Sequence, residues 1–419
     1  MNAKAKVLVA GGGFAGLETA FYLRLKLKDR VDITLVSDKD HFLYKPNTIY
    51  IPFGMDPEKL KIPLTLPTKK QNMKFIQAQA RGVNPESRLL ETSQGDLPYD
   101  YLVLATGSRM RPEEIPGMSQ YAQTIFTPDE MLKLRASLGA LKERAREGKR
   151  QKLLFLVPPN NKCSGPLYEI VFMADYWLRE QGVRDNVDIT YSTYEKGFIQ
   201  AFGPRLDGFV TDEFSRLGID GHREYAVERI TASEVVYRNG ESLPYDVLVS
   251  FPPYMASTPF PGLPADDRGF IATELETRKV QGYPEIYAPG DNGDFPVKQA
   301  FMAFLQADAT ASHLARQILP SSENVLFHPT AMCVMEQFSK ATFAKVPLRL
   351  TGDPDRPLEV PESAYADYKL GSSKPWRLGK KLLGYYLPWR FRAGKPFHAG
   401  APWTAMEAGL KVMSSVLAS

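Results

Sequence analysis

The sequence predicts an α/β protein with two similar parallel-sheet domains and a C-terminal region of different character. Two observations indicate the domains: apolar strand-like runs alternate with amphipathic helical patterns, and residues 245–251 repeat the pattern of residues 99–105. A third observation marks off the C-terminal region, because basic and aromatic residues replace this alternation after about residue 369. At 419 residues the chain is long enough for two or three domains.

The first expected strand, residues 7–10, runs into three glycines with the G-x-G-x-x-G spacing. The first glycine allows a tight turn, the second lets a pyrophosphate approach the backbone, and the third lets the following helix pack closely on the strand. That helix would direct free N–H groups and the positive end of its dipole at the phosphates. The residues expected to bind a dinucleotide here are Gly11, Gly13, Phe14, Ala15 and Gly16.

A second strand is expected over residues 31–36, and Asp38 follows it, 25 residues after Gly13. A carboxylate that binds the ribose of a dinucleotide is expected about 20 residues after the glycine turn. An ordinary glycine turn in a βαβ unit is the less favoured interpretation, because both the strand and the acidic residue follow at suitable distances.

The strand expected over residues 99–104 ends in Ala105, Thr106 and Gly107, and a later strand ends at Gly290 and Asp291. Both endings resemble fingerprints of flavoproteins with two dinucleotide-binding domains. The resemblance implies that Asp291 binds the ribityl chain of FAD and that the helix beginning near Lys298 points at the flavin pyrimidine ring. The FAD-binding residues it adds are Ala105, Thr106, Gly107, Gly290, Asp291 and Lys298.

The second domain begins with a helix over residues 128–150 and a strand over residues 152–157. A nicotinamide-binding relative would carry a second glycine turn after this strand, whereas this chain has Pro158 and Pro159. Prolines lack backbone N–H donors and stiffen the turn, so we expect the domain without its nicotinamide site.

Composition narrows the classes of function. A net charge of +4 does not suggest nucleic acid, and two cysteines are too few for a secreted disulfide scaffold. The longest uncharged stretch is broken by prolines, no signal peptide is apparent at the N-terminus, and we expect neither a transmembrane helix nor a metal site. These observations favour a protein on the cytoplasmic side.

Residues 369–395 contain eight basic residues, no acidic ones, and interleaved tryptophans, tyrosines and phenylalanine. This composition suits the headgroup region of an anionic membrane, and the final residues continue with apolar side chains at helical spacing. A basic surface over a dimer contact, or a helix that caps the core, is the alternative.

Over nearly its whole length the chain resembles the sulfide:quinone oxidoreductases, which are related to flavocytochrome c sulfide dehydrogenase and type II NADH dehydrogenases. The resemblance is carried by the first glycine turn, residues 161–170, residues 290–291 and residues 330–333. It implies that Cys163 and Cys333 face each other across the flavin, joined by a disulfide or polysulfide bridge that accepts sulfur from sulfide.

The residues around Cys163 also favour a reactive thiol, independently of the family resemblance. Pro166 would open a helix, a thiol at a helix N-terminus has a lowered pKa, and Lys162 adjoins it. Glu169 could accept a proton, or equally complement the helix dipole. One cysteine alone would more often be a buried apolar residue. Two in contexts that match the family favour function.

The resemblance implies FAD-dependent oxidation of sulfide to zero-valent sulfur or polysulfide, with electrons passed to a membrane quinone. Phe338 and Tyr386 are candidates for the quinone pocket, although either could be a core aromatic. Many members have a third cysteine and a histidine near residues 124–129, and this chain has neither, which leaves the subtype open. No cysteine lies near residues 41–44, so FAD should be non-covalent.

The alternatives are a type II NADH:quinone oxidoreductase, a flavocytochrome c-like sulfide dehydrogenase subunit, and an FAD-binding protein without turnover. We expect a peripheral protein on the cytoplasmic face of a membrane, and a homo-oligomer stays open. The expected segments are a first FAD-binding part, a second Rossmann-like domain with the first cysteine, a second FAD-binding part with the other cysteine, and a membrane and quinone region. Their bounds are 1–110, 111–268, 269–345 and 346–419.

Overall fold

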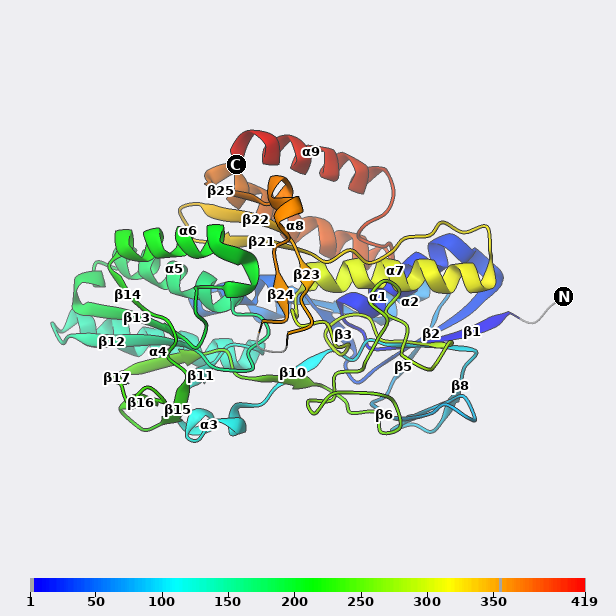
Figure 1. Cartoon of the computed structure of the whole chain (residues 1–419), viewed down its shortest axis with the longest axis horizontal. Coiled ribbons are helices and arrows are strands. Elements are labelled where there is room, and N and C mark those ends of the chain that lie inside the picture. Colours follow the sequence, from blue (N-terminus) through cyan, green and yellow to red (C-terminus); the bar gives the residue numbers. More distant parts are fainter. Residues whose placement is uncertain (1–3, 354–355, 419) are drawn as a thin grey trace.

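The strand that leads into the glycine turn lies at the centre of a five-stranded parallel sheet (Figure 1). The structure is a computed structural model that describes residues 4–353 and 356–418. The order of strands is β20 (Ile286–Tyr287), β9 (Tyr101–Leu104), β1 (Ala5–Ala10), β2 (Val31–Ser37) and β5 (Lys74–Gln77). Helices α1 (Phe14–Leu27) and α7 (Ala300–Ile318) pack against each other beside this sheet. The sheet therefore combines an N-terminal stretch with a strand from much later in the chain.

A second five-stranded parallel sheet forms the other domain. Its order is β11 (Gln123–Thr124), β18 (Val247–Ser250), β12 (Gln151–Val157), β13 (Val187–Thr193) and β14 (Ile219–His222). Its helices are α4 (Pro128–Arg146), α5 (Gly165–Glu180) and α6 (Gly203–Leu217). The two chain crossings between the domains pair antiparallel as β10 (Ser108–Met110) and β19 (Tyr254–Ala256). The predicted pair of similar parallel-sheet domains is confirmed.

Two helix boundaries differ from those predicted. The helix expected over residues 128–150 ends at Arg146, four residues early, and it begins with a capping box between Thr127 and Glu130. The helix expected to open at Pro166 begins one residue earlier, at Gly165. Proline in the first turn costs no hydrogen bond there, so both starts are compatible with the sequence.

The C-terminal region adds a three-stranded antiparallel sheet and two helices. The strands are β21 (Thr330–Glu336), β22 (Ala341–Pro347) and β25 (Lys369–Ser373), and the helices are α8 (Lys374–Arg392) and α9 (Ala401–Leu417). These helices lie at one outer side of the molecule, at the top of Figure 1. Within residues 4–353 and 356–418, no helix has the length and hydrophobicity needed to cross a membrane.

Shorter elements complete the two domains and the C-terminal region. The helices are α2 (Thr65–Lys70), α3 (Met118–Tyr121) and the 3₁₀ segment η2 (Lys45–Phe53). The strands are β3 (His41–Leu43), β4 (Lys61–Pro63), β6 (Ala80–Asn84), β7 (Leu89–Thr92), β8 (Leu97–Pro98), β15 (Val227–Ile230), β16 (Glu234–Tyr237), β17 (Ser242–Pro244), β23 (Arg349–Leu350) and β24 (Leu358–Glu359).

Candidate active site

The glycine turn has the geometry of a phosphate-binding turn. Gly11 has a φ of +123°, and a Cβ there would lie 2.1 Å from the carbonyl oxygen of Ala105. A Cβ on Gly16 would lie 1.9 Å from the carbonyl oxygen of Gly11, whereas a Cβ on Gly13 would meet nothing within 4 Å. Packing therefore requires glycine at positions 11 and 16, whereas Gly13 faces open space. The first turn of α1 has no side-chain cap and no acidic residue, so its N–H groups are available to an anion.

Polar side chains gather where β9 and β20 end beside this turn. The side chain of Ser108 donates a hydrogen bond of 3.4 Å to Asp291, and burial raises the pKa of that carboxyl. The buried hydroxyl of Thr106 has no hydrogen-bond partner among the described residues. A buried hydroxyl without a partner at the mouth of a glycine turn fits a polar ligand such as a ribose or phosphate.

Two lysines lie near Asp291, and the positive charge of each opposes the effect of burial on its pKa. Lys298 is buried, and its ammonium donates to the carbonyl of Gly293 and lies 3.8 Å from the centre of the Phe270 ring. Burial lowers the pKa of Lys298 to about 7. Lys45 lies 3.5 Å from the centre of the Phe126 ring, and burial lowers its pKa to about 8. Sequence reasoning missed Lys45, because no motif marks it.

Asp38 lies just beyond β2, exposed, with one carboxylate oxygen 3.6 Å from the ammonium of Lys39. An exposed carboxylate at the end of the second strand is free to meet a ribose, and its role stays a prediction.

The two cysteines come from different parts of the molecule. Cys163 precedes α5 and Cys333 lies in β21, and both are free and half-buried. The backbone N–H of Cys163 donates to the side-chain oxygen of Asn161 at 3.0 Å, while the amide of Asn161 donates to the carbonyl of Phe251 at 2.7 Å. Asn161 thus anchors the Cys163 loop to the end of the second sheet. An asparagine two residues before a loop thiol is the sequence signal for such a turn, and it was missed.

The expectation that the helix N-terminus lowers the pKa of Cys163 is wrong. Burial raises the pKa of that thiol to about 12, with a further contribution from the charge of Asp291. A backbone hydrogen bond from Gly165 opposes this rise but does not overcome it. Burial also raises the pKa of Cys333, and the charges of Glu169 and Cys163 add to the rise. Both cysteines pack against the same hydrophobic core cluster.

Glu169 has partners that neither sequence interpretation, as a proton acceptor or as a complement to the helix dipole, included. Its buried carboxylate forms an ion pair with Lys380 of α8 and accepts the backbone N–H of Glu336 at 2.7 Å. Lys380 also donates to the carbonyl of Val334 at 2.7 Å. Burial raises the pKa of Glu169, and the positive charge of Lys380 opposes that rise. The carboxylate of Glu169 therefore links its own helix, α5, to α8 and to β21, the strand that contains Cys333. Lys380 is 211 positions away, so no local pattern could reveal it.

The two quinone-pocket candidates lie in different aromatic groups. Phe338 packs on Tyr50, Phe53 and Tyr176, with ring centres 5.2 to 6.3 Å apart. Tyr386 packs on Trp389 and Phe397, and its hydroxyl donates to the carbonyl of Phe397 at 3.5 Å. The described contacts do not bring the two residues together.

Several known proteins are similar to this chain in sequence or in fold. Residues 5–149 match the pyridine nucleotide-disulphide oxidoreductase family. A sulfide-quinone reductase of Aquifex aeolicus is 30% identical over 257 residues, which are 60% of this chain and 58% of that protein. A mitochondrial sulfide:quinone oxidoreductase of Mus musculus is 24% identical over 314 residues, or 71% of this chain and 68% of that protein.

The solved structure of the Aquifex aeolicus sulfide:quinone oxidoreductase superimposes with a TM-score of 0.83, at 23% identity, over 99% of this chain and 96% of that one. The chain is thus similar in sequence and in fold to sulfide:quinone oxidoreductases. NADH-dependent quinone reductases are also similar, among them an external alternative NAD(P)H-ubiquinone oxidoreductase of Arabidopsis thaliana, 24% identical over 69% of this chain and 54% of that protein.

The sequence predicts that FAD binds at this turn. The residues present fit it. Open space at Gly13, the uncapped N-terminus of α1 and the partnerless hydroxyl of Thr106 are what a dinucleotide needs at this turn.

Proposed function

We propose that this chain oxidises sulfide to zero-valent sulfur or polysulfide at Cys163 and Cys333 and passes the electrons through FAD to a membrane quinone. The observation that supports this best is that Cys163, just before α5, and Cys333, in β21, pack against the same hydrophobic core cluster, with Glu169 of α5 hydrogen-bonded to the backbone of Glu336 in β21. The similarity to sulfide-quinone reductases points the same way, although the aligned part spans little more than half of the Aquifex protein. Asp38, Asp291 and the glycine turn would hold the FAD.

In the proposed reaction, hydrosulfide attacks a disulfide between Cys163 and Cys333. The new S–S bond makes a persulfide on one cysteine, and the old S–S bond breaks and leaves a thiolate on the other. A second hydrosulfide attacks the outer sulfur of the persulfide, so that this sulfur leaves as hydrogen disulfide and the second cysteine becomes a thiolate. FAD, when bound, would supply the acceptor for the two electrons released when the two thiolates re-form their disulfide. Asn161 holds the backbone of Cys163 in place throughout. Because burial raises the pKa of both thiols, the leaving thiolate has a strong tendency to take a proton or to react onward.

The second domain supports a donor other than NADH. Its central strand, β12, ends at Val157, where a nicotinamide-binding domain has a glycine turn and this chain has Pro158 and Pro159. Asn161 and Cys163 occupy the loop instead, tied to Phe251. A type II NADH:quinone oxidoreductase is therefore the weaker candidate. A flavocytochrome c-like subunit would share the sulfur site and differ in passing electrons to a cytochrome.

The outer face of α8 supports binding to the surface of a membrane. Leu378, Leu382, Tyr385 and Trp389 are exposed at helical spacing, with Tyr385 77% exposed. Val412 and Val416 of α9 are exposed in the same way. Arg377, Lys380 and Arg390 of the basic stretch turn inward to internal partners, while Lys374, Lys381, Arg392 and Lys395 remain exposed. A mixed apolar and basic face suits an anionic bilayer, which brings a quinone within reach. We propose that the protein binds the cytoplasmic face of this membrane.

The proposed segments follow the four ranges of the sequence analysis, with residues 1–110 and 269–345 holding FAD and residues 111–268 carrying Cys163. Residues 346–419 would carry the membrane and quinone contacts, with Phe338 and Tyr386 as residues to test at the quinone pocket.

The experiment is stopped-flow absorbance of the flavin in the purified holoprotein, mixed with sulfide or with NADH. Sulfide should bleach the flavin rapidly, a short-chain quinone should restore it, and NADH should leave it oxidised. Cys163→Ser and Cys333→Ser should each retain FAD and lose the fast bleaching. Rapid bleaching by NADH would overturn the proposal, and unimpaired bleaching in either variant would remove that cysteine from the reaction.

A further inference from the structure

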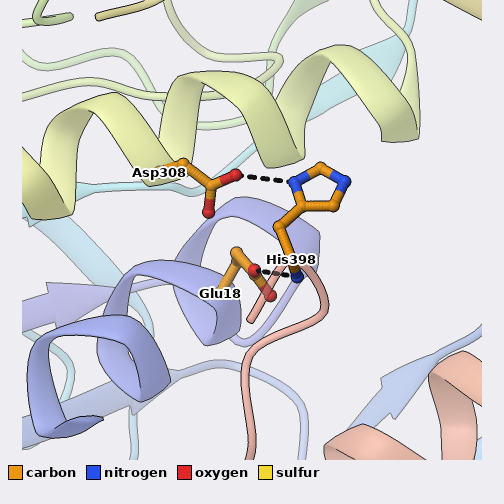
Figure 2. A group of neighbouring side chains, drawn as sticks. All are labelled: Glu18, Asp308 and His398. Atoms are coloured by element: carbon orange, nitrogen blue, oxygen red, sulfur yellow. Dashed lines mark hydrogen bonds and ion pairs between the residues drawn. The ribbon is translucent and has the colours of Figure 1, made fainter. Parts of the chain in front are cut away.

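Three titratable side chains meet in the interior away from the cysteines. They are Glu18 of α1, Asp308 of α7 and His398 of the segment between α8 and α9 (Figure 2). One polar atom of each lies within 4.8 Å of the others. Glu18 is completely buried and Asp308 is 7% exposed. The proposed sulfide chemistry uses none of them.

Both carboxyl groups hold the same short segment. The carboxyl oxygens of Glu18 accept the backbone N–H groups of Phe397 at 2.7 Å and His398 at 3.1 Å. Nδ1 of the His398 ring lies 2.6 Å from one carboxyl oxygen of Asp308. The other oxygen of Asp308 has no hydrogen-bond partner among the described residues and lies on the side of Glu18 in Figure 2. Glu18 therefore binds the backbone of this segment, and Asp308 binds the imidazole of His398.

Two buried carboxyl groups this close cannot both be ionised cheaply. Burial raises the pKa of Glu18 well above its usual value, and the negative charge of Asp308 adds to the rise. A proton on Glu18 relieves this repulsion between the two carboxyl groups. A bound cation could also balance the charges. However, both oxygens of Glu18 already accept backbone N–H groups, and the imidazole is in direct hydrogen-bond contact with Asp308.

The segment bound by these two carboxyl groups, residues 396–399, connects the two C-terminal helices to the FAD-binding domain. Arg390 of α8 donates to the carbonyls of Pro396 and Ala399, at 2.9 Å for its Nε contact with Pro396 and 2.6 Å for Ala399. The ring of Phe397 stacks on Phe304 of α7 with centres 4.8 Å apart. Loosening the segment would therefore loosen the connection of α8 and α9 to α1 and α7.

We propose that Glu18, Asp308 and His398 form a pH-sensitive clasp that holds residues 396–399 on the FAD-binding domain while Glu18 carries a proton, and that loosens when this proton is lost. The clasp does not depend on the proposed sulfide chemistry, because its parts are contacts within the fold.

The direction of the pH dependence follows from linkage. Unfolded Glu18 loses its proton near pH 4.5, whereas folded Glu18 keeps it to higher pH. Between these values the folded state binds more protons, so rising pH weakens the folded clasp until folded Glu18 has also ionised.

The other groups that face the clasp leave this direction unchanged. They are Tyr22 of α1, Glu323 beyond α7, and Tyr386 and Arg390 of α8. Burial raises the pKa values of both tyrosines, so they stay neutral across the range tested. Glu323 forms an ion pair with Lys26 at 3.0 Å.

The test is hydrogen–deuterium exchange of the full-length holoprotein between pH 6 and pH 9.5, expressed as protection factors so that the intrinsic pH dependence of exchange is removed. Peptides that cover residues 393–403 should lose protection at least tenfold over this range, while peptides from β12 stay constant. In Glu18→Gln, which cannot ionise, protection of residues 393–403 should not vary with pH. Glu323→Gln is the matched control and should keep the wild-type profile.

A wild-type segment whose protection does not vary with pH would overturn the clasp, as would an equal decline in Glu18→Gln. Retention of one equivalent of divalent metal by the purified protein, with loss of protection at pH 6 on adding EDTA, would assign the cluster to a cation instead. If Glu18→Gln fails to fold, Asp308→Asn provides the second variant. Removing the charge that faces Glu18 lowers the pKa of folded Glu18, so the loss of protection should become smaller and end at lower pH; an unchanged profile would contradict the proposal.

Discussion

At the scale of single residues, desolvation is the dominant influence on the two thiols. A thiol beside a helix N-terminus ordinarily becomes more acidic, and Cys163 has that position and a neighbouring lysine. Lys162 is half-buried, and burial lowers the pKa of its ammonium group. The negative charge of Asp291 acts in the same direction as burial. The thiols of the reduced protein are therefore protonated near neutral pH.

This result predicts an unusual pH dependence of alkylation. The thiolate fraction of Cys163, whose pKa is raised to about 12, should rise about tenfold for each pH unit up to that value. In the reduced protein, iodoacetamide labelling measured by mass spectrometry should therefore still be increasing at pH 10. Because the chain has only two cysteines, the assignment is unambiguous. A plateau in the labelling rate below pH 8.5 would show that the helix N-terminus lowers the pKa of Cys163 more than burial raises it.

Asn161 should matter to the sulfur chemistry through position alone. Asn161→Ala leaves the N–H of Cys163 and the carbonyl of Phe251 without their partner, and each unmet group costs about 1–3 kcal/mol. We expect sulfide-driven flavin reduction to slow more than tenfold with FAD content unchanged, as measured by stopped flow. The control is Asn160→Gly, because Asn160 has a φ of +64° that glycine adopts freely and it bonds to Glu114, away from the thiol. Equal rates in the two variants would contradict the anchoring role.

At the scale of secondary-structure elements, α8 has two faces with separate tasks. Its inner face carries the buried Trp376, Lys380 and Phe391, and its outer face carries exposed apolar and basic side chains. The sequence predicts that this region binds the surface of a membrane, with a basic surface over a dimer contact or a core-capping helix as the alternative. The structure places core-capping residues on one side of α8 and leaves the other side open.

The outer face predicts lipid binding that point substitutions can remove. Leu378→Ser combined with Leu382→Ser removes two exposed leucines, each able to contribute about 1.5–3 kcal/mol when buried in a bilayer. We expect co-sedimentation with anionic liposomes to weaken at least tenfold. Leu25→Ser combined with Leu275→Ser, exposed leucines on other elements, should leave it unchanged. If the α8 variant still sediments like the wild type, another surface makes the contact.

The elements were predictable where their signals are local. The glycine turn, its flanking strands and the α/β alternation each depend on residues within one βαβ unit, so periodicity and motif spacing reveal them. The ion pair of Glu169 with Lys380 and the clasp of Glu18 with His398 join residues 211 and 380 positions apart. Only the folded chain brings such partners together. The sign of the Cys163 pKa shift was missed for a related reason, because burial is a property of the whole fold.

At the scale of the whole molecule, the C-terminal region connects the two domains. On the side of the FAD-binding domain, Phe391 packs on Phe21 and Phe42, with ring centres 5.5 and 5.1 Å apart. On the other side, Lys380 neutralises Glu169 of α5. One helix thus closes a hydrophobic cluster in the first domain and satisfies a buried charge in the second.

This arrangement predicts a graded response to truncation. A chain ending at Ser373 loses α8 and α9, which uncovers Phe21 and Phe42 and leaves Glu169 buried without its cation; breaking such a pair costs about 3–5 kcal/mol. We expect its melting temperature to fall by more than about 10 °C and its binding of a hydrophobic dye to rise, as judged by differential scanning fluorimetry. A chain ending at Gly400 loses only α9, which has no buried residue among those described, and should melt within a few degrees of the full chain. If removing α8 changes the melting temperature no more than removing α9, the C-terminal region is a membrane attachment alone and does not hold the domains together.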